Sequence, residues 1–90
     1  MMLNQVILIG RVVDTQVSDT ELVQKIILNV TTGTNTDRIA IDIDQKMALY
    51  GPFNENNILA IKARISSKDA NAYSIVADRI TLLGGINRGT

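Results

Sequence analysis

The chain has 90 residues, of which 46% are hydrophobic, and its nine Lys and Arg side chains balance its nine Asp and Glu side chains. This length fits one domain with one core, and the zero net charge argues against a polycation that binds nucleic acid indiscriminately, although it leaves room for a basic patch. Because the chain has no Cys and no His, disulfides, zinc sites built on these residues and the commonest catalytic bases are excluded.

The first predicted element is a long strand over residues 4–13, with the sequence Asn-Gln-Val-Ile-Leu-Ile-Gly-Arg-Val-Val. It is apolar on both alternating faces, which is typical of a strand that is buried on both sides. Gly10 interrupts the run, and a glycine there indicates a bend, a bulge or a close approach of two backbones. A first strand that bends at its middle can pair with neighbours on two sides, which would close a small barrel.

Two further strands follow a polar, turn-prone segment at residues 14–20. They are predicted over about 22–30 and 38–44, and the polar residues 31–37 between them favour a hairpin. The isoleucines of the third strand alternate with polar or small residues and are therefore expected to face the core. They are Ile39, Ile41 and Ile43.

A short helix is predicted after the third strand. Asp44 can cap its N-terminus, residues 45–50 form its turns, and Gly51 and Pro52 end it. We expect Met47, together with Leu49 or Tyr50, to point inward and cover one end of the barrel.

Two strands over 58–66 and 72–83 complete the order β-β-β-α-β-β. This is the order of the oligonucleotide/oligosaccharide-binding barrel, or OB-fold, whereas SH3-like barrels, the nearest alternative, usually lack the helix. We therefore predict an all-β, five-stranded Greek-key OB-fold barrel with one short helix between its third and fourth strands. It would form a single domain over 1–90, with the barrel over about 3–84 and a short tail over 85–90.

Three segments resemble the single-stranded DNA-binding proteins of bacteria and phages. Residues 4–12 look like that family's opening strand, an asparagine followed by an apolar run that ends in Gly-Arg or Gly-Asn. Residues 57–65 (Asn-Ile-Leu-Ala-Ile-Lys-Ala-Arg-Ile) are similar to its fourth strand, and residues 77–84 (Ala-Asp-Arg-Ile-Thr-Leu-Leu-Gly) to its closing strand. The resemblance implies a homo-oligomer, usually a tetramer, that wraps single-stranded DNA without sequence preference during replication, repair or recombination.

The chain departs from this family at the positions that stack on bases. Stacking on aromatic side chains contributes about 1–3 kcal/mol per base in such proteins. Here the corresponding positions fall near Thr34, Thr36, Asp42 and Lys68, none of which is aromatic. We therefore expect binding mainly by charge, weaker than is usual in the family and strongly dependent on salt.

The expected DNA-binding side chains are six cations and one aromatic residue on the outer face of the sheet. They are Arg11, Lys25, Arg38, Lys62, Arg64, Lys68 and Tyr73. Asn29 and Thr31 can add hydrogen bonds there, and Tyr73 is the best remaining stacking candidate. The competing interpretation is that these cations form only a solvated barrel exterior, where like charges also prevent aggregation of strand edges. The residue pattern alone favours that interpretation, and the family resemblance supports DNA binding.

No catalytic, metal or cofactor site is predicted. Asp42 and Asp44 share a strand face and could hold a hard cation with a third oxygen ligand, but a helix cap beside a solvated carboxylate is the simpler explanation. Nothing places two carboxylates together in an apolar pocket, as a glycosidase-like pair would need. We predict a non-enzymatic protein whose partners are single-stranded DNA and other copies of itself. The alternative is a divergent, oligomeric protein-interaction module that has lost DNA binding.

The sequence suggests a cytoplasmic location, in bacteria or in phage-infected cells. The strand pattern begins directly after the first residues, which leaves no room for a signal peptide, and no apolar run approaches about 20 residues. The family usually carries a long flexible tail with an acidic tip that recruits enzymes. In this sequence Arg88 is the last charged residue, so recruitment through such a tail is not expected.

Overall fold

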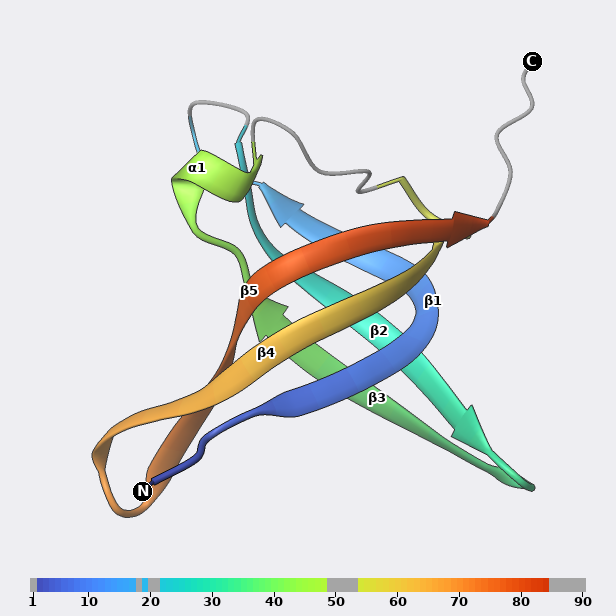
Figure 1. Cartoon of the computed structure of the whole chain (residues 1–90). Coiled ribbons are helices and arrows are strands. Elements are labelled where there is room, and N and C mark those ends of the chain that lie inside the picture. The colour runs from blue at the N-terminus through green and yellow to red at the C-terminus, as the bar shows by residue number, and fades with distance from the viewer. Residues whose placement is uncertain (1, 18, 20–21, 49–53, 85–90) are drawn as a thin grey trace.

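Five strands form a closed barrel in the computed structural model, which describes residues 2–17, 19, 22–48 and 54–84 (Figure 1). The strands follow the order β1-β2-β3-β5-β4 around the barrel. Their bounds are β1 (Val6–Val17), β2 (Val23–Thr32), β3 (Asn35–Asp42), β4 (Ile58–Asp69) and β5 (Ala72–Gly84). The predicted all-β, five-stranded barrel is confirmed.

β1 closes the barrel because it changes partner at its middle. Residues 6–11 pair with β4, whereas residues 11–17 pair with β2. Gly10 lies at the change, where a Cβ atom would stand 2.4 Å from the backbone oxygen of Asn29 and 2.9 Å from Cγ of Leu28. Of the three alternatives that the sequence leaves open at Gly10, the structure shows a close approach of two backbones where β1 changes partner, and the bulge lies further along, between Val12 and Asp14.

The strands extend further than the sequence predicts. β1 continues to Val17 through residues whose polarity predicts a turn, and it contains a bulge between Val12 and Asp14. β2 and β3 are joined by only two turn residues, the first of which is Gly33 at a φ of 62°. A strand in a barrel wall needs apolar residues only on its inner face, so a polar segment remains a strand wherever a neighbour supplies hydrogen bonds.

Inward-facing aliphatic side chains fill the barrel. The buried set is Val12, Ile26, Leu28, Ile41, Ile43, Leu59, Ile61, Ala63 and Ala77. Two of the three isoleucines predicted to face the core, Ile41 and Ile43, are buried, and Ile39 packs against this set while partly exposed. Because side chains alternate along a strand, the polar residues between these positions project outward.

β1 is not buried on both sides, contrary to the prediction. Its inward-facing Val12 is fully buried, but Ile7 and Ile9 on the outward face are 64% and 55% exposed. A single closed barrel has no second layer outside it, so an apolar strand must leave one face uncovered.

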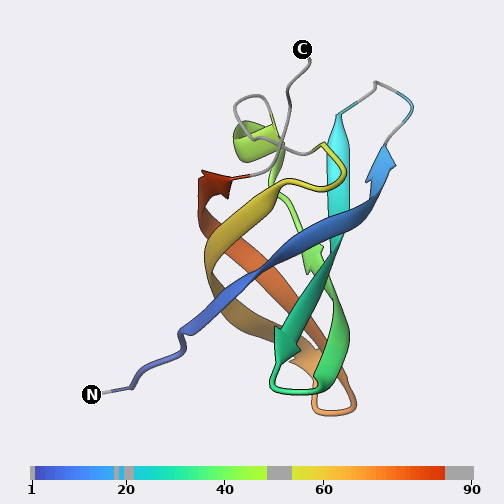
Figure 2. The same cartoon turned by 90° about the vertical axis from the view of Figure 1, so that its right-hand side faces the viewer.

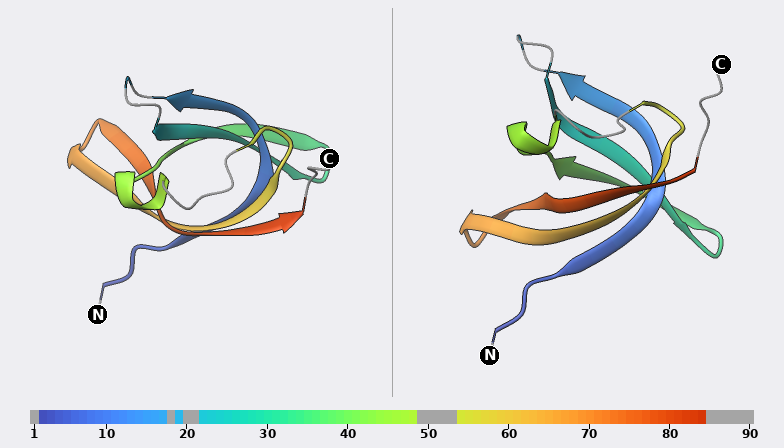
Figure 3. Two further views of the ribbon diagram at one scale, coloured as in Figure 1. Left: turned by 90° about the horizontal axis from the view of Figure 1, so that it is seen from above. Right: turned by 45° about the horizontal axis from the view of Figure 1, so that its top comes forward.

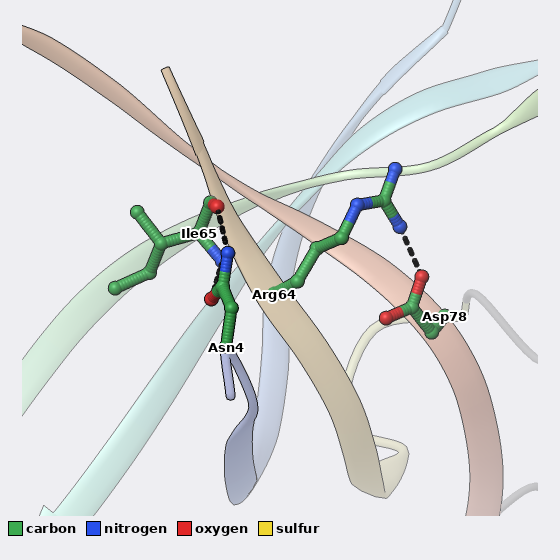
Figure 4. Close-up of polar contacts among 4 residues, drawn as sticks. All are labelled: Asn4, Arg64, Ile65 and Asp78. Carbon is green, nitrogen blue, oxygen red and sulfur yellow. Dashed lines mark hydrogen bonds and ion pairs between the residues drawn. The ribbon is translucent and has the colours of Figure 1, made fainter. Parts of the chain in front are cut away.

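Asn4 extends the ladder between β1 and β4 with its side chain. Its Nδ2 donates a hydrogen bond to the backbone oxygen of Ile65 at 2.6 Å, and the backbone N–H of Ile65 donates to Oδ1 of Asn4 at 2.9 Å (Figure 4). The amide thus makes both hydrogen bonds that a paired backbone would make, two residues beyond the Val6–Ala63 pair. This gives the asparagine at the head of the apolar run a structural role.

One helical turn, α1 (Gln45–Ala48), lies near one end of the barrel between β3 and β4 (Figure 1). Oδ1 of Asp44 accepts a hydrogen bond from the backbone N–H of Lys46 at 3.3 Å, which is an N-cap contact, and the partly buried Met47 packs against the core. The later part of the predicted helix, its Gly-Pro end and the tail over 85–90 lie outside the described residues. In the described part of the chain, no helix is long and apolar enough to cross a membrane.

Candidate nucleic-acid interface

A row of polar side chains crosses three strands on the outside of the barrel. Arg11 of β1 pairs with Asn29 of β2, which in turn pairs with Arg38 of β3. Residues that pair directly across antiparallel strands project on the same face, about 5 Å apart. Both arginines are exposed, and neither forms an ion pair within the part of the chain that the structure describes. We call Arg11, Asn29 and Arg38 the arginine row.

A pocket of about 350 Å³ opens beside the arginine row. Its lining residues are Ile9, Gly10, Arg11, Asn29, Thr31, Thr36 and Ile58. Thr31 and Thr36 face each other across β2 and β3, with their hydroxyl oxygens hydrogen-bonded at 2.9 Å. Oδ1 of Asn29 is buried and accepts no hydrogen bond from any described residue. The pocket therefore combines apolar walls with a guanidinium, two hydroxyls and an amide whose oxygen lacks a donor.

Lys25 lies on the same face but is paired with an acid. Its Nζ is 3.4 Å from Oδ1 of Asp42, its direct partner across β2 and β3. Both side chains are more than one-third exposed, so water screens the pair and its contribution to stability is only about 0–1 kcal/mol. A phosphate can therefore compete for Lys25 at little cost.

Among the residues that the structure describes, no three acidic side chains gather to hold a metal ion.

Lys62 lies on the opposite wall. Viewed along the barrel, β2 and β3 form one wall, β4 and β5 form the other, and β1 curves between them (Figure 3, left). Lys62 of β4 stands between Ile7 of β1 and Arg79 of β5. Arg79 is a cation that sequence reasoning missed, and only the register of the β4–β5 hairpin places it beside Lys62. A second pocket of about 240 Å³ lies along this wall, and these three residues are among those that line it.

Arg64 lies on the same wall and forms an ion pair with Asp78 (Figure 4). The pair depends on an irregularity in β5, because the register shifts between the Lys62–Arg79 pair and the Ala63–Ala77 pair. This shift leaves Asp78 without a strand partner of its own. The positive charge of Arg64 is therefore already compensated.

Lys68 and Tyr73 lie near the tip of the β4–β5 hairpin, where both are exposed, Tyr73 to 69%. This hairpin and the one that joins β2 to β3 project from the same end of the barrel (Figure 2, orange and green). In Figure 1 their tips lie on opposite sides of that end. Tyr73 is thus accessible, but it lies on the β4–β5 hairpin, whereas the arginine row lies on β1, β2 and β3.

The seven predicted side chains do not share one outer face, contrary to the expectation. They fall into three groups: Arg11, Lys25 and Arg38 on the β1–β2–β3 side; Lys62 and Arg64 on the β4–β5 wall; Lys68 and Tyr73 near a hairpin tip. Strand alternation separates inward from outward residues, but the closure of the barrel then distributes the outward residues around its circumference. Of these seven side chains, the structure brings only Arg11 and Arg38 together as exposed cations without an acidic partner among the described residues.

Comparison with known proteins identifies the fold. No protein-family model matches the sequence, and no curated protein matches it. The structure is similar to the dimeric N-terminal domain of the PriB protein from Thermoanaerobacter tencongensis, with a TM-score of 0.71 and 17% identity over 91% of this chain and 98% of that one. It is also similar to the mitochondrial single-stranded DNA-binding protein Rim1 of S. cerevisiae, with a TM-score of 0.70 and 14% identity over 92% and 97% of the two chains. This barrel therefore has the OB-fold of those proteins.

Proposed function

We propose that this protein binds single-stranded DNA without sequence preference, through the arginine row and mainly by charge. The observation that carries the proposal is the pair of exposed guanidiniums of Arg11 and Arg38, which flank Asn29 on one face and have no acidic partner among the described residues. The fold supports it, because the structural neighbours include a single-stranded DNA-binding protein. The role is non-catalytic and belongs to replication, repair or recombination, in the cytoplasm of bacteria or of phage-infected cells.

The geometry favours weak binding that depends on salt. A guanidinium binds phosphate with two parallel hydrogen bonds. Each phosphate of a single strand that a protein cation neutralises contributes about −0.7 to the slope of log affinity against log salt concentration. The two arginines thus account for a slope of about −1.4, and release of Lys25 from Asp42 can raise it to about −2.1. Because none of the described residues on this face is aromatic, little affinity remains once salt screens the charges.

A fluorescence titration with oligo-dT over a series of salt concentrations tests the proposal. We expect clear binding at low salt, with a slope between about −1.4 and −2.1. A duplex of the same length is the control, and weaker binding of the duplex at matched phosphate concentration would show the preference for a single strand. Absence of oligo-dT binding at the lowest salt would contradict the proposal and leave the alternative, an oligomeric protein-interaction module.

We also propose that the protein associates with itself through the outward face of β1. Ile7 and Ile9 are large, apolar and more than half exposed, and residues 6–10 pair with β4 alone. A second copy placed against this stretch would cover both the side chains and the unpaired backbone edge. The similar PriB domain is dimeric. The proposed assembly is a homo-oligomer, either a dimer or a tetramer, and sedimentation would distinguish the two.

Sedimentation of the Ile7→Lys variant tests the self-association. We expect the unchanged protein to sediment as an oligomer at micromolar concentration and the variant as a monomer, because an ammonium group cannot be buried in an apolar interface without a partner, and Lys62, which pairs with position 7 across the strands, is itself a cation. Val17→Lys is the matched control, since Val17 is 53% exposed at the other end of the same strand. A monomeric unchanged protein, or a variant that sediments as the unchanged protein does, would exclude this interface.

A further inference from the structure

We infer that the pocket beside the arginine row receives one nucleobase, held by the amide of Asn29 and covered by the guanidinium of Arg11. The inference rests on the proposed function and deepens it, because it assigns a base site to a face on which no described residue is aromatic. The bound base would belong to the strand whose phosphates the two arginines hold. Three properties of the pocket carry this inference: its shape, its amide and its guanidinium.

The shape of the pocket suits a flat, mostly apolar group. Its volume of about 350 Å³ lies near the lower end of the range for small-molecule sites, about 300–1,000 Å³. Ile9 and Ile58 contribute apolar surface, and Gly10 contributes backbone without a side chain. Ile58 pairs with Arg11 on the β4 side, as Asn29 does on the β2 side, so the apolar and polar parts of the lining meet at Arg11.

Asn29 supplies the hydrogen-bonding group. Its Oδ1 is buried from solvent and accepts no hydrogen bond from any described residue, so the amide gains a hydrogen bond if it turns this oxygen toward an occupant of the pocket that donates to it. Rotation about the Cβ–Cγ bond is soft, so the amide can turn either its oxygen or its NH₂ group toward the pocket. The Watson–Crick edge of every base places a donor next to an acceptor, and an amide can pair with each of them. The site therefore accepts any of the bases and loses its contacts only when the base is missing. This agrees with binding that has no sequence preference.

Arg11 supplies the surface that an aromatic side chain would otherwise provide. A guanidinium can stack its plane on a base while its N–H edge still donates to a phosphate, and it does so best when no carboxylate holds it elsewhere. Arg11 is exposed and has no acidic partner among the residues described. The paired hydroxyls of Thr31 and Thr36 lie on the β2–β3 side of the same pocket. One hydroxyl hydrogen of that pair is free to donate to a sugar or phosphate oxygen.

An abasic oligomer separates this inference from the proposed function. We would measure the affinity of oligo-dT and of a tetrahydrofuran abasic oligomer with the same number of phosphates. The expected result is at least a tenfold weaker affinity for the abasic oligomer with an unchanged salt slope, because the phosphate contacts are the same. Equal affinities would overturn the base site while leaving the electrostatic proposal intact. Failure of both oligomers to bind would overturn both.

Two further measurements place the base in this pocket. Asn29→Leu should bring the ratio of oligo-dT to abasic affinity close to one, whereas Thr81→Val, in the pocket on the β4–β5 wall, should leave that ratio unchanged. In the unchanged protein, the side-chain amide signals of Asn29 in a ¹⁵N–¹H spectrum should shift when oligo-dT is added and stay in place when the abasic oligomer is added. This measurement tests the role of Asn29 even if Asn29→Leu does not fold. An unmoved Asn29 signal, or full displacement of oligo-dT by equimolar thymidine monophosphate, would overturn the assignment to a base of the bound strand.

Discussion

Gly10→Ala is expected to lower the free energy of unfolding by about 3 kcal/mol, which corresponds to roughly 12–24 °C in Tm for a domain of this size. The added Cβ would stand 2.4 Å from the backbone oxygen of Asn29 and 2.9 Å from Cγ of Leu28. The leucine can shift a little, but the carbonyl belongs to a paired strand and cannot move without separating β1 from β2. Thermal and urea unfolding followed by circular dichroism would measure the loss.

Two other glycines provide matched controls for Gly10→Ala. A Cβ on Gly84 would meet nothing within 4 Å, so Gly84→Ala should leave the stability nearly unchanged. Gly33 also has open space but a φ of 62°, so Gly33→Ala should lose about 1–2 kcal/mol through backbone strain alone. If Gly10→Ala were no more harmful than Gly84→Ala, the close approach at the bend of β1 would be refuted.

Reversing the charge of both row arginines is expected to lower oligo-dT affinity roughly 10- to 100-fold at low salt and to reduce the salt slope by about 1.4. Arg11→Glu with Arg38→Glu removes two phosphate contacts and replaces each with a repulsion. Neither arginine forms an ion pair within the described residues, so the change breaks no salt bridge there and the barrel should remain folded. Fluorescence titrations over the same salt series, with a circular dichroism spectrum of the variant, would measure the effect.

The matched control reverses two cations on the other wall. Lys62→Glu with Arg79→Glu makes the same change in net charge at residues that pair with each other across β4 and β5. Its effect should be limited to the long-range loss of positive potential, which salt screens over about 10 Å at 0.1 M. If this variant lost as much affinity as the first while the first kept its salt slope, the DNA would bind to the β4–β5 wall and the arginine row would be the wrong site.

Local patterns were sufficient to predict the barrel and the inward-facing isoleucines after residue 38, although they wrongly predicted that β1 is buried on both sides. The alternation of Ile39, Ile41 and Ile43 correctly separates core from exterior on β3, and a glycine inside an apolar run correctly marks the bend of β1. Both features depend on interactions that each strand must make in any barrel: a period of two along the backbone and room for a neighbouring chain. The element order then restricts the ways in which five strands can close.

The site depends on contacts between residues distant in sequence. The sequence predicts Asn29 only as a hydrogen-bonding residue beside the expected cations. Nothing in its neighbourhood along β2 indicates that Arg11 and Arg38 lie on either side of it. Arg79 escaped notice for the same reason, since its place beside Lys62 follows from a register shift in β5.

The sequence by itself thus determined the approximate positions of the strands, the inward-facing isoleucines of the third predicted strand and the bend at Gly10, because these follow from the stereochemistry of single segments. Only the tertiary structure decided which outward side chains meet, because strand register and barrel closure distribute them between opposite walls. It also left Ile7 and Ile9 bare, since one barrel has nothing to place over them. Within the described residues, two arginines without an acidic partner, an asparagine oxygen without a donor and an exposed apolar strip are therefore products of closure, and they are the features on which the proposed binding surfaces rest.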